Sequence, residues 1–260
     1  MSLTLAIYQG SPVMGDPEAA LTCLERQLST ASAAGASMLV MPELFLPGYN
    51  QPALHKSLAQ SLNGDWMQRL RHMMLSKNCG VTIGWAERTE AGVFNAATAI
   101  DRDGNILGHY HKIQLFGDME KRSFVPGDRY VIFDLDGIRT ALLICYDVEF
   151  AQHVHALAAQ GVSLILVPTA NPTGYEHVPE HLLPARAAEM GISIAYANYC
   201  GSEGDLSFCG QSLLVGPDGR YRAKAGASPA LLIADLSAEI APALRSTQLT
   251  DLRKVQPYVS

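Results

Sequence analysis

Ala141-Leu142-Leu143-Ile144-Cys145-Tyr146-Asp147 is an apolar run that ends in a thiol and, two residues later, a carboxylate. Residues 140–145 predict a buried strand, and residues 150–160 predict a helix shortly after it. A strand-to-helix turn can expose a side chain and place backbone N–H groups beside it, which suits a thiolate nucleophile and an oxyanion site. Cys145 is therefore a candidate nucleophile, and a thiol buried in the core is the ordinary alternative.

Strand and helix signals alternate along the rest of the chain, without an internal repeat or a linker. Ten further strands are predicted over residues 3–8, 38–41, 81–85, 94–100, 106–110, 131–135, 163–168, 192–198, 211–215 and 230–234, and further helices over 16–34, 65–77 and 180–190. Asp-Gly pairs at 103–104, 136–137 and 218–219 favour hairpins between strands. Helices thus separate some strands and hairpins join others. This mixture predicts an α/β fold of two sheets packed face to face with helices outside, in a single domain over residues 1–260.

Composition excludes several classes of function. The 260 residues include 19 Lys+Arg and 25 Asp+Glu, a formal charge of −6, which disfavours nucleic-acid binding. No stretch approaches the roughly 18 apolar residues of a spanning helix, so no membrane partner is expected. The five cysteines form neither an even framework nor a C-x-x-C pair, and no export signal is visible, so a cytoplasmic location is expected. The charged fraction of 17% is low and is consistent with a surface partly covered by another subunit.

Two other predicted strand ends carry reactive groups. The run 39–42 leads into Glu43, just before a turn at Pro47 and Gly48, and the run 106–111 leads into Lys112. Taken singly, Glu43 has an ordinary explanation as a surface carboxylate or helix cap, and Lys112 as a solvated loop residue. Together with Cys145 they form a complete chemical set, because a carboxylate in an apolar pocket can take the proton of a thiol and an ammonium can stabilise an oxyanion.

These motifs resemble the nitrilase or carbon-nitrogen hydrolase superfamily, whose members share a Glu-Lys-Cys triad. The similarity covers nearly the whole chain and is carried by residues 42–43, 48–49, 110–116, 125–127, 143–147 and 186–189. It implies a four-layer αββα sandwich, commonly paired into homodimers through the helices that flank the sheets, and no metal or cofactor. It also implies that Glu43, Lys112 and Cys145 are catalytic. Glu120 is similar to the second glutamate of the family, which positions substrate or assists hydrolysis; a salt bridge on a loop is its structural alternative.

The residues after the cysteine narrow this resemblance. True nitrilases typically have Cys-Trp-Glu, whereas Cys145-Tyr146-Asp147 is similar to the amidase and carbamoyl-hydrolase branches. Residues 6–10, 115–117, 167–171, 196–201, 209–212 and 249–253 further resemble the subgroup of 5-aminopentanamidase and related stereoselective aliphatic amidases. The chain departs from those branches at Glu149, where many have arginine, and at Ala151-Gln152, where the subgroup commonly has Pro-Glu. The resemblance implies hydrolysis of a small aliphatic amide, such as 5-aminopentanamide, to a carboxylate and ammonia through a cysteine thioester.

Roles in substrate binding are predicted for four further residues, Tyr49, Tyr146, Glu149 and Asn171. Glu149, with Asp118 or Glu203, is a hypothetical acceptor for an amine on the substrate, because a carboxylate left unpaired discriminates against an analogue without that amine. The alternative for Glu149 is that it caps the following helix or pairs with an arginine.

Other functions remain open or are disfavoured. A metal hydrolase could use His109 with His111, His153 with His155, or His177 with His181. Pro179 interrupts the last pair, no H-E-x-x-H motif occurs, and His111 adjoins Lys112, so metal catalysis is disfavoured. An N-carbamoyl amine hydrolase, an acyltransferase of the same chemistry, and a non-catalytic binding protein on the same scaffold stay open.

Overall fold

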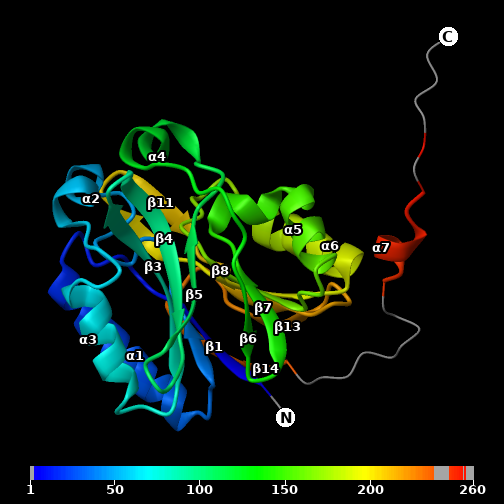
Figure 1. The fold of residues 1–260 in the computed structure, drawn as a ribbon, viewed down its shortest axis with the longest axis horizontal. Helices are drawn as coiled ribbons and strands as arrows, with labels where there is room; N and C mark the ends of the chain where they lie inside the picture. The colour runs from blue at the N-terminus through cyan, green and yellow to red at the C-terminus, as the bar shows by residue number, and fades with distance from the viewer. Residues whose placement is uncertain (1–2, 237–245, 254, 256–260) are drawn as a thin grey trace.

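Two six-stranded sheets form the centre of the computed structural model, which describes residues 3–236, 246–253 and 255 (Figure 1). The first sheet has the order β14 (Ala230–Asp235), β1 (Thr4–Gln9), β2 (Met38–Val40), β3 (Gly80–Thr89), β4 (Gly92–Ile100), β5 (Ile106–His111). The second has the order β13 (Tyr221–Lys224), β12 (Leu213–Val215), β9 (Ser193–Ala197), β8 (Leu164–Pro168), β7 (Ile138–Leu142), β6 (Ile132–Leu135). In both sheets three neighbouring strands are parallel, β1 to β3 and β7 to β9, and the others pair antiparallel.

Helices cover the outer face of each sheet and complete four layers (Figure 1). On the first sheet lie α1 (Pro17–Ala33) and α3 (Asp65–Met74), and on the second lie α5 (Ala151–Ala158) and α6 (Leu183–Met190). The short elements are α2 (Pro52–Leu58), α4 (Gly117–Ser123), α7 (Gln248–Asp251), a 3₁₀ turn (Cys145–Glu149), a π turn (Val178–Leu182) and the hairpin β10 (Cys200–Glu203) and β11 (Leu206–Cys209).

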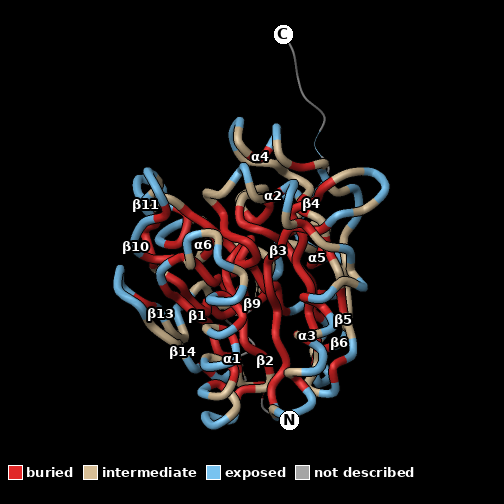
Figure 2. Tube along the Cα trace, turned by 90° about the vertical axis from the view of Figure 1, so that its left-hand side faces the viewer, coloured by how far each residue is buried: buried red, intermediate tan, exposed pale blue. Residues whose placement is uncertain are grey.

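The sequence of α1 shows why the layers form. Asp16 accepts hydrogen bonds from the backbone N–H groups of Glu18 and Ala19, and so caps the helix before its first residue, Pro17. Apolar residues then recur at helical spacing, and the buried residues are Ala20, Leu21, Leu24, Leu28 and Ala31. This stripe packs on the first sheet, while Figure 2 shows that exposed residues lie on the outer side of α1 and at loop tips and that buried residues fill the central strands.

The predicted four-layer αββα sandwich is confirmed, and so are the three Asp-Gly hairpins, which join β4 to β5, β6 to β7 and β12 to β13. The strand predicted over residues 140–145 differs: β7 ends at Leu142, and Cys145 begins a 3₁₀ turn. The loop containing Glu120 includes the helix α4, where the exposed Lys121 and Arg122 lie on the outer surface. No helix among the described residues is long and apolar enough to cross a bilayer. The single domain over 1–260 stays a prediction, and part of that range lies outside the described residues.

Candidate active site

Glu43 is positioned by a loop that leaves β2 and folds against β3. The backbone N–H of Gly84 on β3 donates to the carbonyl of Pro42 over 3.2 Å, so the two backbones touch. A Cβ atom at Gly84 would lie 2.6 Å from the Cα atom of Glu43, so only glycine allows this approach. The Tyr199 hydroxyl donates to the backbone carbonyl of Glu43 over 2.9 Å. The loop thus holds the Glu43 carboxylate in the interior with no exposed surface.

Lys112 follows the last residue of β5 and lies between two carboxylates. Its Nζ atom donates to Glu43 Oε1 over 2.6 Å and to Glu120 Oε1 over 2.7 Å. All three side chains are completely buried. Two further donors hold Glu120: the Tyr49 hydroxyl contacts Oε1 over 2.8 Å, and the backbone N–H of Phe116 contacts Oε2 over 2.9 Å. The structure therefore brings Glu120 together with Lys112 and Glu43 in one buried cluster, and its role in positioning substrate or assisting hydrolysis stays a prediction.

Burial and neighbouring charges set the ionisation of this cluster. Burial raises the pKa of Glu43 to about 7, although the Lys112 ammonium and the hydrogen bond from Asn95 lower it. Burial alone lowers the pKa of Lys112, but the charges of Glu120 and Glu43 outweigh it and hold the pKa well above the usual value. Glu43 Oε1 accepts from both Lys112 and Asn95 Nδ2, whereas Oε2 has no hydrogen-bond partner among the described residues. Glu43 therefore has a free oxygen and a pKa suited to a general base near neutral pH.

Cys145 begins the 3₁₀ turn with φ of 45°, a left-handed conformation that is costly for a residue with a side chain. Asp147 holds this turn, because its Oδ2 accepts from the backbone N–H of Ile144 over 3.1 Å and from the Tyr110 hydroxyl over 2.9 Å. Its Oδ1 accepts from the backbone N–H of Gln114 over 2.7 Å. Cys145 is 7% exposed, and burial together with the Glu43 charge raises the pKa of its thiol well above the usual value. The resting residue is therefore a thiol that needs a base.

Comparison with known proteins agrees with this chemistry. Residues 4–245 match the family model described as carbon-nitrogen hydrolase. The chain belongs to that family. The amidase from Nesterenkonia sp. is a structural neighbour of this carbon-nitrogen hydrolase, with a TM-score of 0.87 and 36% identity over 96% of this chain and 93% of the neighbour. Another structure of that amidase shows acrylamide added to its active site cysteine, and a mutant of it was solved in complex with butyramide.

Curated relatives include two proteins from Pseudomonas. A hydrolase from the pqqF 5′ region of Pseudomonas protegens is 38% identical over 242 residues, covering 92% of this chain and 84% of the relative. An (R)-stereoselective amidase from Pseudomonas sp. is 33% identical and covers 78% of this chain and 74% of its own length. The predicted family, its fold and its class of enzyme are confirmed.

One predicted substrate-binding residue, Tyr49, lines a cavity, and a second, Tyr146, packs against a residue that lines it. A cavity of about 270 Å³ is lined by Tyr49 and Phe116, and the Tyr146 ring packs edge to face on Phe116 with centroids 5.2 Å apart. Tyr49 also donates to Glu120, so it links the cavity to the buried cluster. Asp118 lines the same cavity, but 85% of its side chain is exposed.

The other predicted polar residues have different surroundings. Asn171 is buried, and its Nδ2 donates to the carbonyl of Tyr175 over 3.0 Å and to Cys209 Sγ, so its amide fixes the local loop. Glu203 accepts from the backbone N–H of Asn50 over 2.6 Å and from the side chain of Gln51. Neither its carboxylate nor that of Asp118 contacts Glu149 among the described residues. A substrate-binding role for Asn171 stays a prediction.

Three residues of the site were not identified from the sequence. Asn95 bonds the carboxylate of Glu43, Asp147 holds the cysteine turn, and Tyr199 fixes the loop that contains Glu43. Asn95 stands alone as an amide within the apolar run 94–100, and Asp147 follows the cysteine by two residues. A polar side chain within a buried strand needs a buried partner, and that signal was available for Asn95.

Proposed function

We propose that this chain is an amidase that hydrolyses small aliphatic amides to a carboxylate and ammonia through a cysteine thioester. One observation carries the proposal: the Lys112 ammonium is buried between Glu43 and Glu120, and the charges of Lys112 and Glu43 both act on the Cys145 thiol. The amides bound or added in the structures of the Nesterenkonia enzyme support acrylamide- and butyramide-sized substrates.

The reaction follows from the roles of these groups. Glu43 takes the proton of Cys145 as Sγ attacks the carbonyl carbon of the amide, and the oxyanion is held by Lys112 and the backbone N–H of Tyr146. Collapse of the tetrahedral intermediate breaks the C–N bond, and Glu43 returns the proton to the departing ammonia. Water then attacks the thioester, with Glu43 as base assisted by Glu120. Acid forms, and the thiol is regenerated.

The test of this mechanism combines turnover with detection of the intermediate. Replacing Cys145→Ala should abolish ammonia release from butyramide, and mass spectrometry of the wild type stopped during turnover should find the acyl group on the peptide containing Cys145. Exhaustive chelation should leave turnover unchanged, because every proposed step uses water and groups of the protein chain. Ordinary turnover by Cys145→Ala, or an acyl group on another residue, would refute the mechanism. Product analysis that detects carbon dioxide as well as ammonia would point to a carbamoyl substrate.

Glu149 supports a finer proposal about the substrate. It ends the 3₁₀ turn that starts at Cys145, and burial raises its pKa to about 7 while the charge of Lys112 lowers it. Arg186 donates to its backbone carbonyl over 3.1 Å, but the Glu149 carboxylate accepts no hydrogen bond from the described residues. The alternative that Glu149 pairs its carboxylate with an arginine is therefore not what the structure shows. A half-buried carboxylate without a partner is available to an ammonium group on the substrate.

Paired substrates test this finer proposal. We expect the wild type to prefer 5-aminopentanamide to pentanamide in kcat/KM, and Glu149→Gln to remove about tenfold or more of that preference while retaining turnover of pentanamide. Equal kcat/KM for the two amides would exclude amine recognition by Glu149 but would leave the amidase mechanism intact.

A further inference from the structure

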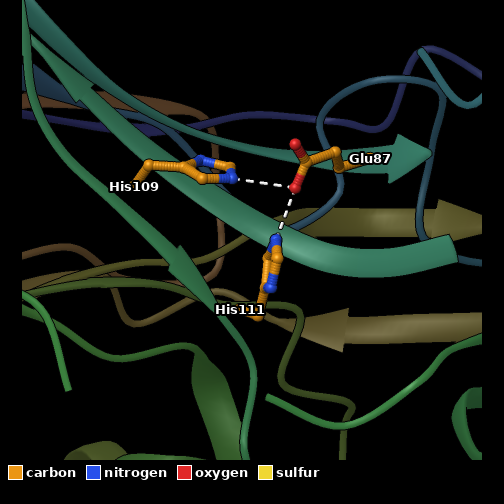
Figure 3. A group of neighbouring side chains, drawn as sticks. All are labelled: Glu87, His109 and His111. Atoms are coloured by element: carbon orange, nitrogen blue, oxygen red, sulfur yellow. Dashed lines mark hydrogen bonds and ion pairs between the residues drawn. The ribbon is translucent and has the colours of Figure 1, made fainter. Parts of the chain in front are cut away.

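A second cluster of titratable side chains lies on the face of the first sheet opposite to the catalytic residues. Glu87 extends from β3, and His109 and His111 extend from β5 (Figure 3). His109 Nε2 lies 2.8 Å from Glu87 Oε2, and His111 Nε2 contacts the same oxygen. Strand residues alternate between faces, so Tyr110 and Lys112 point into the interior while the two histidines point outward. The mechanism proposed above does not use this cluster.

Strand register explains how side chains on β3 and β5 meet although β4 lies between them. Trp85, Ala96 and His111 form one row across the three strands. The middle residue of that row is alanine, so only a methyl group stands above β4 at this point. Glu87 lies two residues beyond Trp85 on the same face and reaches across β4 to both histidines (Figure 3).

Neighbouring side chains fix the orientation of both imidazoles. His109 Nδ1 lies 2.9 Å from Thr98 Oγ1, which itself accepts from Trp85 Nε1 over 2.9 Å. The His111 ring stacks on Phe94 with centroids 4.0 Å apart and planes 14° apart. In this arrangement each Nε2 donates to the Glu87 carboxylate. When a metal ion replaces that proton, the Thr98 hydroxyl can accept the proton of His109 Nδ1, the tautomer usual for histidines that bind metals.

The cluster is reachable from outside and carries a fixed negative charge. Its three candidate ligand atoms lie within 4.8 Å of one another. His109 and His111 are 18% and 27% exposed and line a cavity of about 580 Å³, whereas Glu87 is 6% exposed. The Glu87 carboxylate faces both imidazoles and supplies a negative charge at the centre of the cluster. Two imidazole nitrogens and one carboxylate oxygen, with an open side, are a donor set that suits Zn²⁺.

We propose that Glu87, His109 and His111 form a binding site for one divalent transition-metal ion of the Zn²⁺ type. The ion is held by the Nε2 atoms of both histidines and an oxygen of Glu87, and a water molecule from the cavity takes the fourth position. Each imidazole binds through a deprotonated Nε2 with its proton on Nδ1, so a histidine that is doubly protonated beforehand releases one proton. The bound ion links β3 to the edge strand β5 and so stabilises the strand that precedes Lys112.

Metal titration of histidine variants tests the site. The full chain with Cys145→Ala, which removes the reactive thiol as a competing ligand, is titrated with Zn²⁺ by calorimetry and with Co²⁺ by absorption spectroscopy. We expect one ion per chain, a cobalt spectrum without a thiolate charge-transfer band, and a rise in Tm on addition of Zn²⁺. Adding His109→Asn or His111→Asn should weaken binding by ~10-fold or more. The matched control, His72→Asn on the exposed side of α3, should bind as before.

Three results would overturn the proposal. They are no binding at millimolar Zn²⁺, binding that both histidine variants retain unchanged, and a thiolate band in the cobalt spectrum that assigns the ion to a cysteine. If the histidine variants do not fold, Glu87→Gln keeps the shape of the side chain and removes its charge, and it must weaken Zn²⁺ binding for the site to stand. None of these results bears on amide hydrolysis, so the two proposals fail separately.

Discussion

His111 and Lys112 are consecutive residues, yet they belong to two clusters of opposite design. Lys112 is a cation between the carboxylates of Glu43 and Glu120 with no access to water, and Glu87 is an anion between two imidazoles beside an open cavity. In the first cluster burial raises the pKa of Glu43 to about 7, and in the second the histidines lower the pKa of Glu87 to about 2. A carboxylate poised to exchange a proton suits a base, whereas one that stays ionised suits a ligand.

The largest effect is expected from Lys112→Met, which leaves two buried carboxylates without their cation. Turnover should fall by about a thousandfold or more, because the oxyanion loses a charged donor. Stability should fall by about 3–5 kcal/mol at neutral pH, because an uncompensated charge remains buried. Initial rates of ammonia release and denaturant unfolding measure the two losses. If Lys112→Met had the same free energy of unfolding as the wild type, water would have to reach the two carboxylates more readily than their contacts indicate.

Glu43→Gln should lower kcat by about a hundredfold to ten-thousandfold, since the amide cannot accept the proton of the thiol. In the wild type, kcat/KM should rise with pH through about 7, where Glu43 loses its proton, and should fall below that value. The pH profile of kcat/KM for Glu43→Gln should lack this rise through about 7. An unaltered acid limb in the variant would assign the titration to another group.

A smaller effect is expected from Asp147→Asn. The substitution keeps the shape of the side chain that holds the Cys145 turn but replaces one acceptor oxygen by a donor. The backbone N–H of Ile144 or of Gln114 then loses its partner, at a cost of about 1–3 kcal/mol. Displacement of the thiol should lower kcat by about tenfold to a hundredfold, with little change in KM. Asp134→Asn, at an exposed residue of β6 that accepts from the backbone N–H of Gly137, is a matched control that should retain full kcat.

The smallest expected effect is on the pH dependence of the free energy of unfolding, which should have opposite signs for the two clusters. The pKa of Glu87 is lower in the folded chain than in the unfolded chain, so its contribution, about 1–3 kcal/mol at pH 7, should disappear as pH falls from about 4.5 towards 2. For Glu43 the folded pKa is raised, so the sign is opposite and ionisation costs stability as pH rises through about 7. Unfolding of Glu87→Gln and the wild type at pH 7 and pH 3 measures the first contribution. The difference in unfolding free energy should be smaller at pH 3 than at pH 7, and a difference that does not shrink would contradict this prediction.

The sequence predicted Glu43, Lys112 and Cys145 as candidate catalytic residues because these reactive groups follow apolar strands, a pattern that resembles a known family. It did not predict contacts that depend on strand register. Asn95 on β4 bonds the Glu43 carboxylate, and Glu87, which pairs with Phe94 on β4, reaches diagonally past Ala96 to His111. The end of strand β7 at Leu142 could not be predicted either, because the apolar run in the sequence continues to Ile144.

Gly84 limits how this scaffold can be altered. Glu43 lies on a loop that approaches β3 closely because Gly84 has no side chain, so the loop from Pro42 to Leu44 cannot be exchanged independently of that strand. Libraries intended to widen substrate range would do best to vary the aromatic rim around Phe116 and Tyr146 and to leave this backbone contact untouched. Diversity would then accumulate around the cavity lined by Phe116 rather than in the buried cluster of Glu43, Lys112 and Glu120.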